Sequence, residues 1–288
     1  MKLRYNFIVL ALLLAFSACN DGIDLPEPVN DDAVIEQYIA DNNLNANKSD
    51  EWDVYYVELA AGTGSQVKRD SVVEIEYENA LLDGQVISSD TSYTFVPEVY
   101  AFIPGMQRGV LTMQEGGKSL VFIPSKYAYG GASGTLNGVF VPANAVLQST
   151  ITVKDVRTRN EQLLLEVDNI ERYIEEKGYA DASGNQNGLF KQILSEGQGD
   201  ATPQAGARIV VRYEGSFLDG TVFDSAEDAQ FNLTANGLIK GFYDGALTMK
   251  RDEEAVFIMV SDLGYKDTGT GSIPPFTPLV FKIKMLDF

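Results

Sequence analysis

The chain has 288 residues, of which 45% are hydrophobic and 22% are charged, so it can bury one large core or two ordinary ones. Its formal net charge of −19 argues against nucleic acid and anionic membrane surfaces as partners, because both attract basic proteins. The absence of histidine and the single cysteine exclude a Ser-His-Asp triad, a Cys-His pair, a His-ligated zinc site and an intrachain disulfide. Any chemistry must therefore use carboxylates, hydroxyls, lysines, backbone groups or the shape of a pocket.

The start of the chain, residues 1–18, is typical of a lipoprotein signal peptide. Two basic residues precede an apolar run at 7–16 that is too short to span a bilayer, and small residues then lead to Cys19. We therefore expect cleavage before Cys19 and its lipidation, with the acidic residues 19–31 serving as a tether. The expected location is the bacterial cell envelope, on the periplasmic or the surface side of the outer membrane. An ordinary signal peptide with a chance cysteine is the alternative.

The rest of the sequence repeats itself at an offset of 135 or 136 residues. The motif Ile-Glu-x-Tyr-Ile at 35–39 returns at 170–174, and Leu-Asp-Gly at 82–84 returns at 218–220. The order and spacing of such matches hold over about 80 residues with a single one-residue slip. We therefore expect two homologous domains, each with its own leading helix. Their boundaries are predicted at 32–157 and 158–288.

Each repeat has the same predicted elements in the same order. It opens with a helix, at about 32–44 and 160–177, whose apolar residues recur at helical spacing. We expect these helices to pack on their own domains, although their spacing would also allow two chains to pair. Short strands with alternating apolar residues follow, and one short helix interrupts them, so the fold class is α+β. The predicted strands are 54–59, 72–81, 189–194, 209–217 and 279–286.

Several short motifs occur in a fixed order in the second copy. They include VVRYEG at 210–215, LDGTVFDS at 218–225, LIKGF at 238–242, IPP at 273–275 and LVF at 279–281. Through this series the second copy closely resembles the FKBP family of peptidyl-prolyl isomerases. The resemblance implies an antiparallel sheet that curls around a short helix, with an apolar pocket between them. It implies no metal and no cofactor.

The resemblance also implies which residues form the pocket. Phe242 stands where the family usually has Trp, and Lys266 follows Tyr265 where the family usually has Gly. Taken alone, strand aromatics such as Tyr213 and Phe281 are as often core residues, and the order of the whole set favours a pocket. The residues expected to catalyse are Tyr213, Phe223, Asp224, Ile239, Phe242, Tyr265 and Phe281, and those expected to bind substrate are Phe231, Leu238 and Ile273.

Such a pocket suits the isomerisation of an X–Pro amide. Rotation of this bond has a barrier of about 18–20 kcal/mol because it breaks amide resonance. A dry aromatic pocket can favour the twisted amide over the planar one, and this needs no nucleophile, metal or cofactor. We expect the Tyr265 hydroxyl and the Ile239 N–H to donate to the carbonyl groups of the substrate. Asp224 is expected to orient neighbours such as Tyr213.

The first copy keeps the frame of the repeat but loses most of the pocket lining. Tyr77 matches Tyr213, and Ile103 is kept. The Gly-rich residues 130–138 predict a flexible loop near the mouth of the pocket. We therefore expect the first domain to bind or to space rather than to catalyse, with a different peptide preference as the alternative. The replacements are Ile87 for Phe223, Ser88 for Asp224, Met106 for Phe242 and Ser149 for Phe281.

The sequence as a whole predicts a lipid-anchored peptidyl-prolyl cis-trans isomerase that assists the folding of exported proteins, with catalysis in the second domain. Its partners would be proline-containing segments of exported proteins and, through Cys19, a lipid membrane, with no nucleic acid. The alternative is a non-catalytic binding or chaperone lipoprotein that recognises proline-containing peptides. A nutrient-binding or adhesive lipoprotein is a weaker third possibility.

Overall fold

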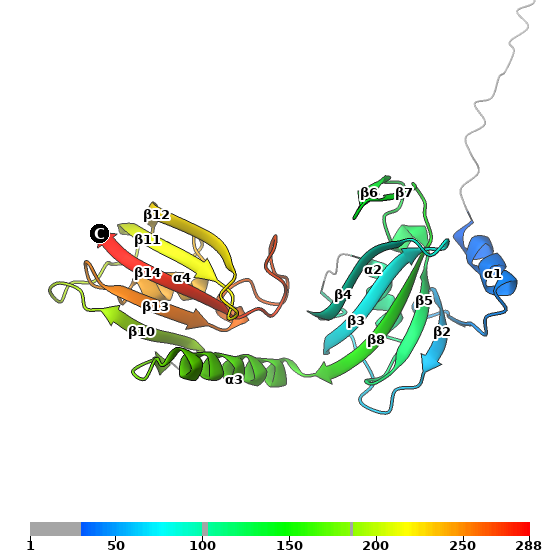
Figure 1. Cartoon of the computed structure of the whole chain (residues 1–288), viewed down its shortest axis with the longest axis horizontal. Helices are drawn as coiled ribbons and strands as arrows, with labels where there is room; N and C mark the ends of the chain where they lie inside the picture. The colour runs from blue at the N-terminus through cyan, green and yellow to red at the C-terminus, as the bar shows by residue number, and fades with distance from the viewer. Residues whose placement is uncertain (1–29, 100–102, 185–186) are drawn as a thin grey trace, which may run out of the picture. The chain divides into compact units, whose positions relative to one another are not determined.

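The computed structural model describes residues 30–99, 103–184 and 187–288 (Figure 1). The predicted signal peptide, the predicted lipidation site Cys19 and the predicted tether up to residue 29 lie outside these residues. In this described part of the chain, every helix is too short or too polar to cross a membrane.

The first domain is built on a sheet of six antiparallel strands in the order β1-β2-β5-β8-β3-β4 (Figure 1). The alternation read from the sequence decides its two faces, because Ile75 and Tyr77 of β3 are buried while Glu76 and Glu78 are exposed. The short helix α2 (Pro104–Val110) packs on the buried face. The strands are β1 (Asn47–Ser49), β2 (Val54–Ala60), β3 (Val72–Leu81), β4 (Val86–Phe95), β5 (Lys118–Ile123) and β8 (Leu147–Arg157).

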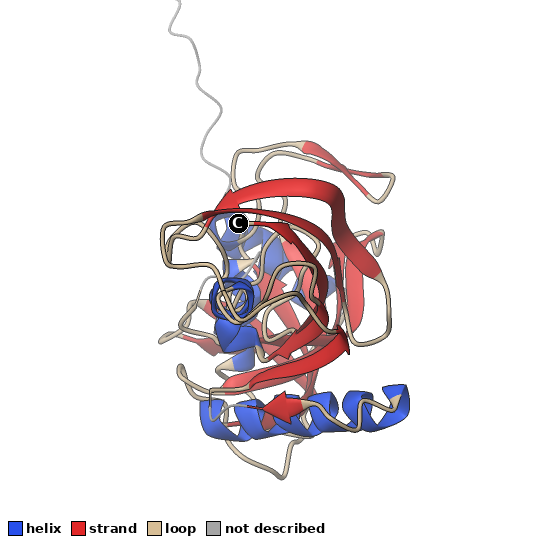
Figure 2. Ribbon diagram, turned by 90° about the vertical axis from the view of Figure 1, so that its left-hand side faces the viewer, coloured by secondary structure: helices blue, strands red, loops and turns tan. Residues whose placement is uncertain are grey.

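The second domain repeats this topology strand for strand, in the order β9-β10-β13-β14-β11-β12. Figure 2 shows its strands curling around the short helix α4 (Lys240–Ala246), which occupies the same place as α2. The structure therefore confirms the predicted α+β class with two equivalent domains. The strands are β9 (Ser183–Gly184), β10 (Leu189–Ser195), β11 (Arg208–Ser216), β12 (Val222–Asn232), β13 (Glu254–Met259) and β14 (Leu279–Asp287).

The glycines of the repeated Ile-x-Gly motif bring each short helix close to its sheet. A Cβ added at Gly105 would lie 2.1 Å from Cγ2 of Ile123, and one added at Gly241 would lie 2.3 Å from Sδ of Met259. A larger residue at either position would force the helix, or the strand side chain that it meets, to shift. The motif therefore sets the distance between helix and sheet, and with it the depth of the space beneath the helix.

A leading helix packs on each domain, as predicted. Ile35 of α1 (Asp31–Asp41) is fully buried in a cluster with Tyr55 and Phe122 of the first domain. Ile170 and Tyr173 of α3 (Arg159–Lys177) belong to the core of the second domain. A capping box begins α3, and left-handed Gly178 ends it.

The first leading helix is shorter than predicted, because it ends at Asp41 rather than at 44. Asn43 adopts a left-handed backbone with φ of 50°, through which a right-handed helix cannot continue. The N–H of Leu44 instead donates to the carbonyl oxygen of Ile39 (3.0 Å), which closes the last turn.

The prediction of a flexible loop at 130–138 is wrong in part. Strands β6 (Gly134–Leu136) and β7 (Val139–Val141) pair as a hairpin. Its turn residues, Asn137 and Gly138, have φ of 47° and 83°, as a tight type I′ turn requires. Nδ2 of Asn137 donates to the backbone carbonyl oxygen of Ile87 (2.9 Å), so the hairpin is fixed to β4.

Candidate functional site

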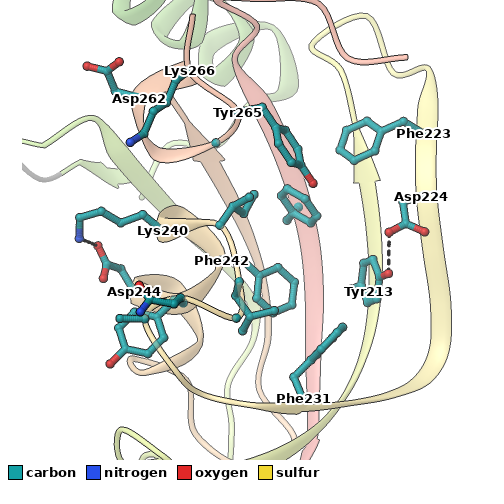
Figure 3. Close-up of a pocket in the computed structure, with 18 residues that line it drawn as sticks. Tyr213, Phe223, Asp224, Phe231, Lys240, Phe242, Asp244, Asp262, Tyr265 and Lys266 are labelled. Atoms are coloured by element: carbon teal, nitrogen blue, oxygen red, sulfur yellow. Dashed lines mark hydrogen bonds and ion pairs between the residues drawn. The ribbon is translucent and has the colours of Figure 1, made fainter. Parts of the chain in front are cut away.

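A pocket of about 820 Å³ lies in the second domain between α4, the curled sheet and the loop after the short 3-10 helix η2 (Ser261–Leu263) (Figure 3). It brings together residues from strands and loops that are far apart in the sequence. Nine of the ten residues predicted for the site line it. They are Tyr213, Phe223, Asp224, Phe231, Leu238, Ile239, Phe242, Tyr265 and Phe281.

Phe242 forms the floor of the pocket. It is only 4% exposed, and its ring meets three other aromatic rings edge to face or nearly so (Figure 3). The ring centroids of Tyr213, Phe231 and Phe281 lie 5.8, 5.6 and 5.4 Å from that of Phe242. Such contacts hold a ring in one orientation. Phe in place of the family's usual Trp therefore still gives a fixed aromatic floor.

Tyr213 and Asp224 form the polar edge of the same pocket. The Tyr213 hydroxyl donates a 2.7 Å hydrogen bond to Oδ2 of Asp224, from one strand of the β11–β12 pair to the other (Figure 3). Burial, with the adjacent carboxylate, raises the pKa of Tyr213 to about 12. The hydroxyl thus keeps its proton at neutral pH, and the carboxylate fixes its direction, as expected for an orienting residue.

Gly215 makes room for the aromatic wall of the pocket, which is formed by the rings of Phe223 and Phe281. This glycine was not singled out from the sequence. A Cβ added there would lie 2.8 Å from the ring of Phe223 and 2.9 Å from the ring of Phe281. Those two rings pack edge to face at 5.7 Å. The signal was visible in the repeat, because Tyr-Glu-Gly of the second copy aligns with Tyr-Glu-Asn of the first.

Tyr265 stands on the loop after η2, at the rim of the pocket (Figure 3). Burial raises the pKa of its hydroxyl, and the charge of Asp224 adds to the effect. Lys266 next to it has φ of 58°, a left-handed backbone that favours glycine. Gly130 holds the equivalent place in the first domain, with φ of 57°. The loop therefore keeps the shape expected of a glycine although lysine occupies the position.

The structure adds charged residues to the rim. On α4, Nζ of Lys240 lies 2.5 Å from Oδ2 of Asp244, and Asp262 of η2 and Lys266 of the following loop also line the pocket (Figure 3). The four-residue spacing of Lys240 and Asp244 could have been recognised in the sequence, because residues four apart are neighbours on a helix surface. The described residues contain no group of three side chains suited to hold a metal ion. The other added lining residues are Ala235, Asn236, Gly237, Tyr243 and Gly264.

Ile273 is the one predicted site residue that does not line this pocket. Its backbone exchanges two hydrogen bonds with Thr270 (2.9 and 2.8 Å), which form a tight turn in the loop before β14. The side chain is 7% exposed and packs in the core of the second domain. Its side chain therefore belongs to the core and not to the pocket lining, which the motif alone did not reveal.

Several of the equivalent side chains of the first domain are deeply buried. Ile87, Ile103 and Met106 are at most 2% exposed, whereas their partners in the second domain other than Phe242 are partly exposed. Asn79 stands at the position of Gly215, is fully buried, and donates from Nδ2 to Oγ of Ser88 (3.0 Å). An amide side chain therefore occupies the place that the second domain leaves to its aromatic wall.

An antiparallel sheet curled around one short helix, with an aromatic pocket between them, defines the FKBP-like class of domain. The family model described as "FKBP-type peptidyl-prolyl cis-trans isomerase" matches residues 63–154 and 199–286, one segment in each domain. These segments make up more than half of the chain. The chain therefore belongs to the FKBP-type peptidyl-prolyl cis-trans isomerase family.

The chain is 37% identical over 111 residues to FK506-binding protein 59 of Drosophila melanogaster, a match that covers 37% of this chain and 25% of that protein. It is 34% identical over 122 residues to the FKBP-type 22 kDa peptidyl-prolyl cis-trans isomerase of Escherichia coli (strain K12), covering 40% and 58%. The chain thus spans less than two thirds of the length of each of these two relatives. The three FKBP domains of wheat FKBP73 are 23% identical with a TM-score of 0.35, covering 82% of this chain and 94% of that one.

Proposed function

We propose that this chain catalyses the cis-trans isomerisation of X–Pro bonds and that the second domain carries the activity. The observation behind this proposal is the pocket floored by Phe242, which is walled by Phe223 and Phe281 and edged by the Tyr213–Asp224 hydrogen bond. Membership of the isomerase family supports the same activity. The aromatic rings suit the flat, apolar ring of proline, and the polar edge suits the amide beside it.

The chemistry follows from differential binding of the twisted amide. Aromatic walls exclude water from the rotating bond and so favour the form that lacks the charge separation of a planar amide. Tyr265, whose hydroxyl keeps its proton at neutral pH, is assigned as a donor to a substrate carbonyl group. Ile239 lines the pocket at the N-cap of α4, and its backbone N–H is assigned as the second donor. No covalent bond forms or breaks.

We assign a different task to the first domain, which holds clients or positions the second domain. Asn79 fills the space that Gly215 leaves open, and the positions of Phe223 and Phe281 carry Ile87 and Ser149, both buried. A proline ring has no aromatic wall to stack on at this place. The absence of that wall from the first copy supports the division of labour.

We place this activity in the bacterial cell envelope, on exported proteins. The support comes from the sequence, where an apolar run at 7–16 leads to Cys19 and an acidic stretch follows. Lipidation at Cys19 would hold both domains at a membrane. Labelling with a radioactive fatty acid tests this part, because Cys19→Ala should abolish incorporation, and unchanged incorporation would contradict it.

The second candidate is recognition of proline-containing segments without turnover. Lys266 favours it, since a lysine at a left-handed position of the rim departs from the family's usual glycine next to Tyr265. Both candidates require the same pocket, so binding alone does not separate them. A rate measurement does.

The deciding experiment compares matched tyrosine variants of the whole chain. Isomerisation of a proline-containing tetrapeptide is followed for the wild type, Tyr265→Phe and Tyr129→Phe, the last being the same change at the equivalent place in the first domain. We expect Tyr265→Phe to lower the rate and Tyr129→Phe to leave it unchanged. Binding of the peptide with no turnover by the wild type would establish the second candidate, and an equal loss in both variants would overturn the division of labour.

A further inference from the structure

In each domain, a carboxylate of the leading helix accepts two hydrogen bonds from a serine of the domain body. In the second domain, Oε2 of Glu166 accepts from the N–H of Ser261 (2.7 Å), and Oε1 accepts from its hydroxyl (3.0 Å). In the first domain, Oδ2 of Asp31 accepts from the N–H (2.8 Å) and the hydroxyl (2.7 Å) of Ser125. The two contacts join equivalent places of the repeat, because both offsets are 135 or 136 residues.

The acid in the second domain is deeply buried. Glu166 is 2% exposed, and Ser261 is also 2% exposed. A third hydrogen bond, from Nε2 of Gln162 to Oε1 (3.0 Å), completes its surroundings. Burial raises the pKa of Glu166, so an ionised carboxylate at this place costs the folded state free energy. Attachment of the helix alone does not require the acid, since Ile170 and Tyr173 already pack in the core.

Ser261 is the point from which the rim of the pocket is built. Its carbonyl oxygen accepts from the N–H of Gly264 (2.8 Å) and from the N–H of Lys266 (2.9 Å), so residues 261–266 form a loop closed on Ser261. Four residues of this loop line the pocket, among them Tyr265 (Figure 3). Whatever fixes Ser261 therefore fixes the direction from which Tyr265 enters the pocket.

A second contact ties α3 to the far end of the same loop. Nη1 of Arg159 lies 2.7 Å from Oδ2 of Asp267, immediately after Lys266. This ion pair is partly exposed and contributes little on its own. Together with the buried contact at Ser261, it places both ends of the rim loop against α3.

We propose that Glu166 is a positioning residue for the isomerase site and acts through Ser261 to hold Tyr265 at the rim. This inference rests on the proposed function of the second domain. The first domain contains the same contact at Asp31 but lacks the aromatic wall, so there the contact serves the fold alone. Asp31→Asn is therefore the matched control for Glu166→Gln.

The test is a double-mutant cycle in the whole chain. Glu166→Gln keeps the size of the side chain but presents an amide donor to the two donors of Ser261. We expect kcat/KM to fall about tenfold, because small displacements of a positioned group are costly in rate. In a Tyr265→Phe background, the same change should cost no more than about twofold, because the group on which Glu166 acts is already gone. Asp31→Asn should leave the rate unchanged.

Hydrogen exchange supplies a readout that does not depend on turnover. In Glu166→Gln, the backbone amides of Gly264 and Lys266 should exchange faster. Asp31→Asn should instead accelerate exchange only at the equivalent amides of the first domain. Ser261→Ala, which removes one hydroxyl and keeps the N–H, serves as a milder variant should Glu166→Gln fail to fold, with a smaller change expected in both readouts.

The outcomes separate the two ideas. A wild type without turnover contradicts the proposed function, and the exchange rates then decide only whether Glu166 fixes the rim loop. An active wild type overturns the inference if Glu166→Gln keeps its full rate, if its loss is undiminished in the Tyr265→Phe background, or if Asp31→Asn costs as much. Unchanged exchange at Gly264 and Lys266 would overturn it as well.

Discussion

Gly215 and Asn79 occupy equivalent positions in the two domains. Gly215 lies beside the aromatic wall of the second domain, whereas the Asn79 side chain fills the corresponding space in the first domain. A Cβ at Gly215 would come within 2.9 Å of the ring of Phe281, whereas Asn79 faces Ser149 across the equivalent strand pair. We expect Gly215→Asn to displace the wall and to lower kcat/KM by about 100-fold or more. Isomerisation of a tetrapeptide measures this, with Asn79→Gly as the control that should leave the rate unchanged. Full activity of Gly215→Asn would show that the wall does not hold the proline.

Phe242 should be important for stability as well as for the pocket. Because it is buried and contacts three aromatic rings, Phe242→Ala should lower the free energy of unfolding by about 3–4 kcal/mol. Phe140, which is 62% exposed on β7, offers the same substitution at a surface, and Phe140→Ala should change stability by less than about 0.5 kcal/mol. Urea unfolding compares the two. Similar losses would mean that Phe242 is not packed as described.

The left-handed backbone at Lys266 predicts a stabilising substitution. Lysine at φ of 58° is strained, so Lys266→Gly should raise the free energy of unfolding by about 0.5–1 kcal/mol. Gly130→Lys, the reverse change at the equivalent position, should lower it by at least about 1 kcal/mol. Thermal or urea unfolding would detect both. A destabilising Lys266→Gly would show that the lysine side chain contributes contacts worth more than the strain.

Tyr213 predicts a loss of stability at alkaline pH. Its pKa in the folded state, about 12, lies above the ordinary value of 10.0, so the folded protein favours the protonated hydroxyl. The resulting stabilisation is fully present below pH 10 and is lost as the pH rises from 10 towards 12. The free energy of unfolding of Tyr213→Phe should therefore fall less steeply over this range than that of the wild type. Parallel curves would refute the assignment, and the comparison removes the contribution of other tyrosines.

The sequence predicted the parts of the fold that depend on repetition and alternation. Two copies of one strand pattern gave two sheets of identical order, and the buried face of β3 follows from Val73-x-Ile75-x-Tyr77. Turn chemistry was harder to use. The Asn137-Gly138 pair predicts a tight hairpin, but the glycines around it suggested flexibility.

Most of the candidate site could also be predicted, because nine of the ten residues implied by the family resemblance meet in one pocket. Ile273 could not, since its side chain packs in the core and does not line the pocket, which the motif does not show. Glu166 could not either, because a charged residue on an amphipathic helix is ordinarily assigned to its solvent face. Only the three-dimensional placement of Ser261 beside α3 shows that this acid is buried.

The capping box of α3 has a practical consequence for dividing the chain. Strand β8 ends at Arg157 and α3 begins at Arg159, so Thr158 is the single residue between them. Its side chain accepts from the N–H of Glu161, and its own N–H donates to that glutamate. A cut one residue later would therefore fray the helix that carries Glu166. An expression fragment of the second domain should therefore start at Thr158 or earlier. We also expect slow proteolytic cleavage between β8 and α3.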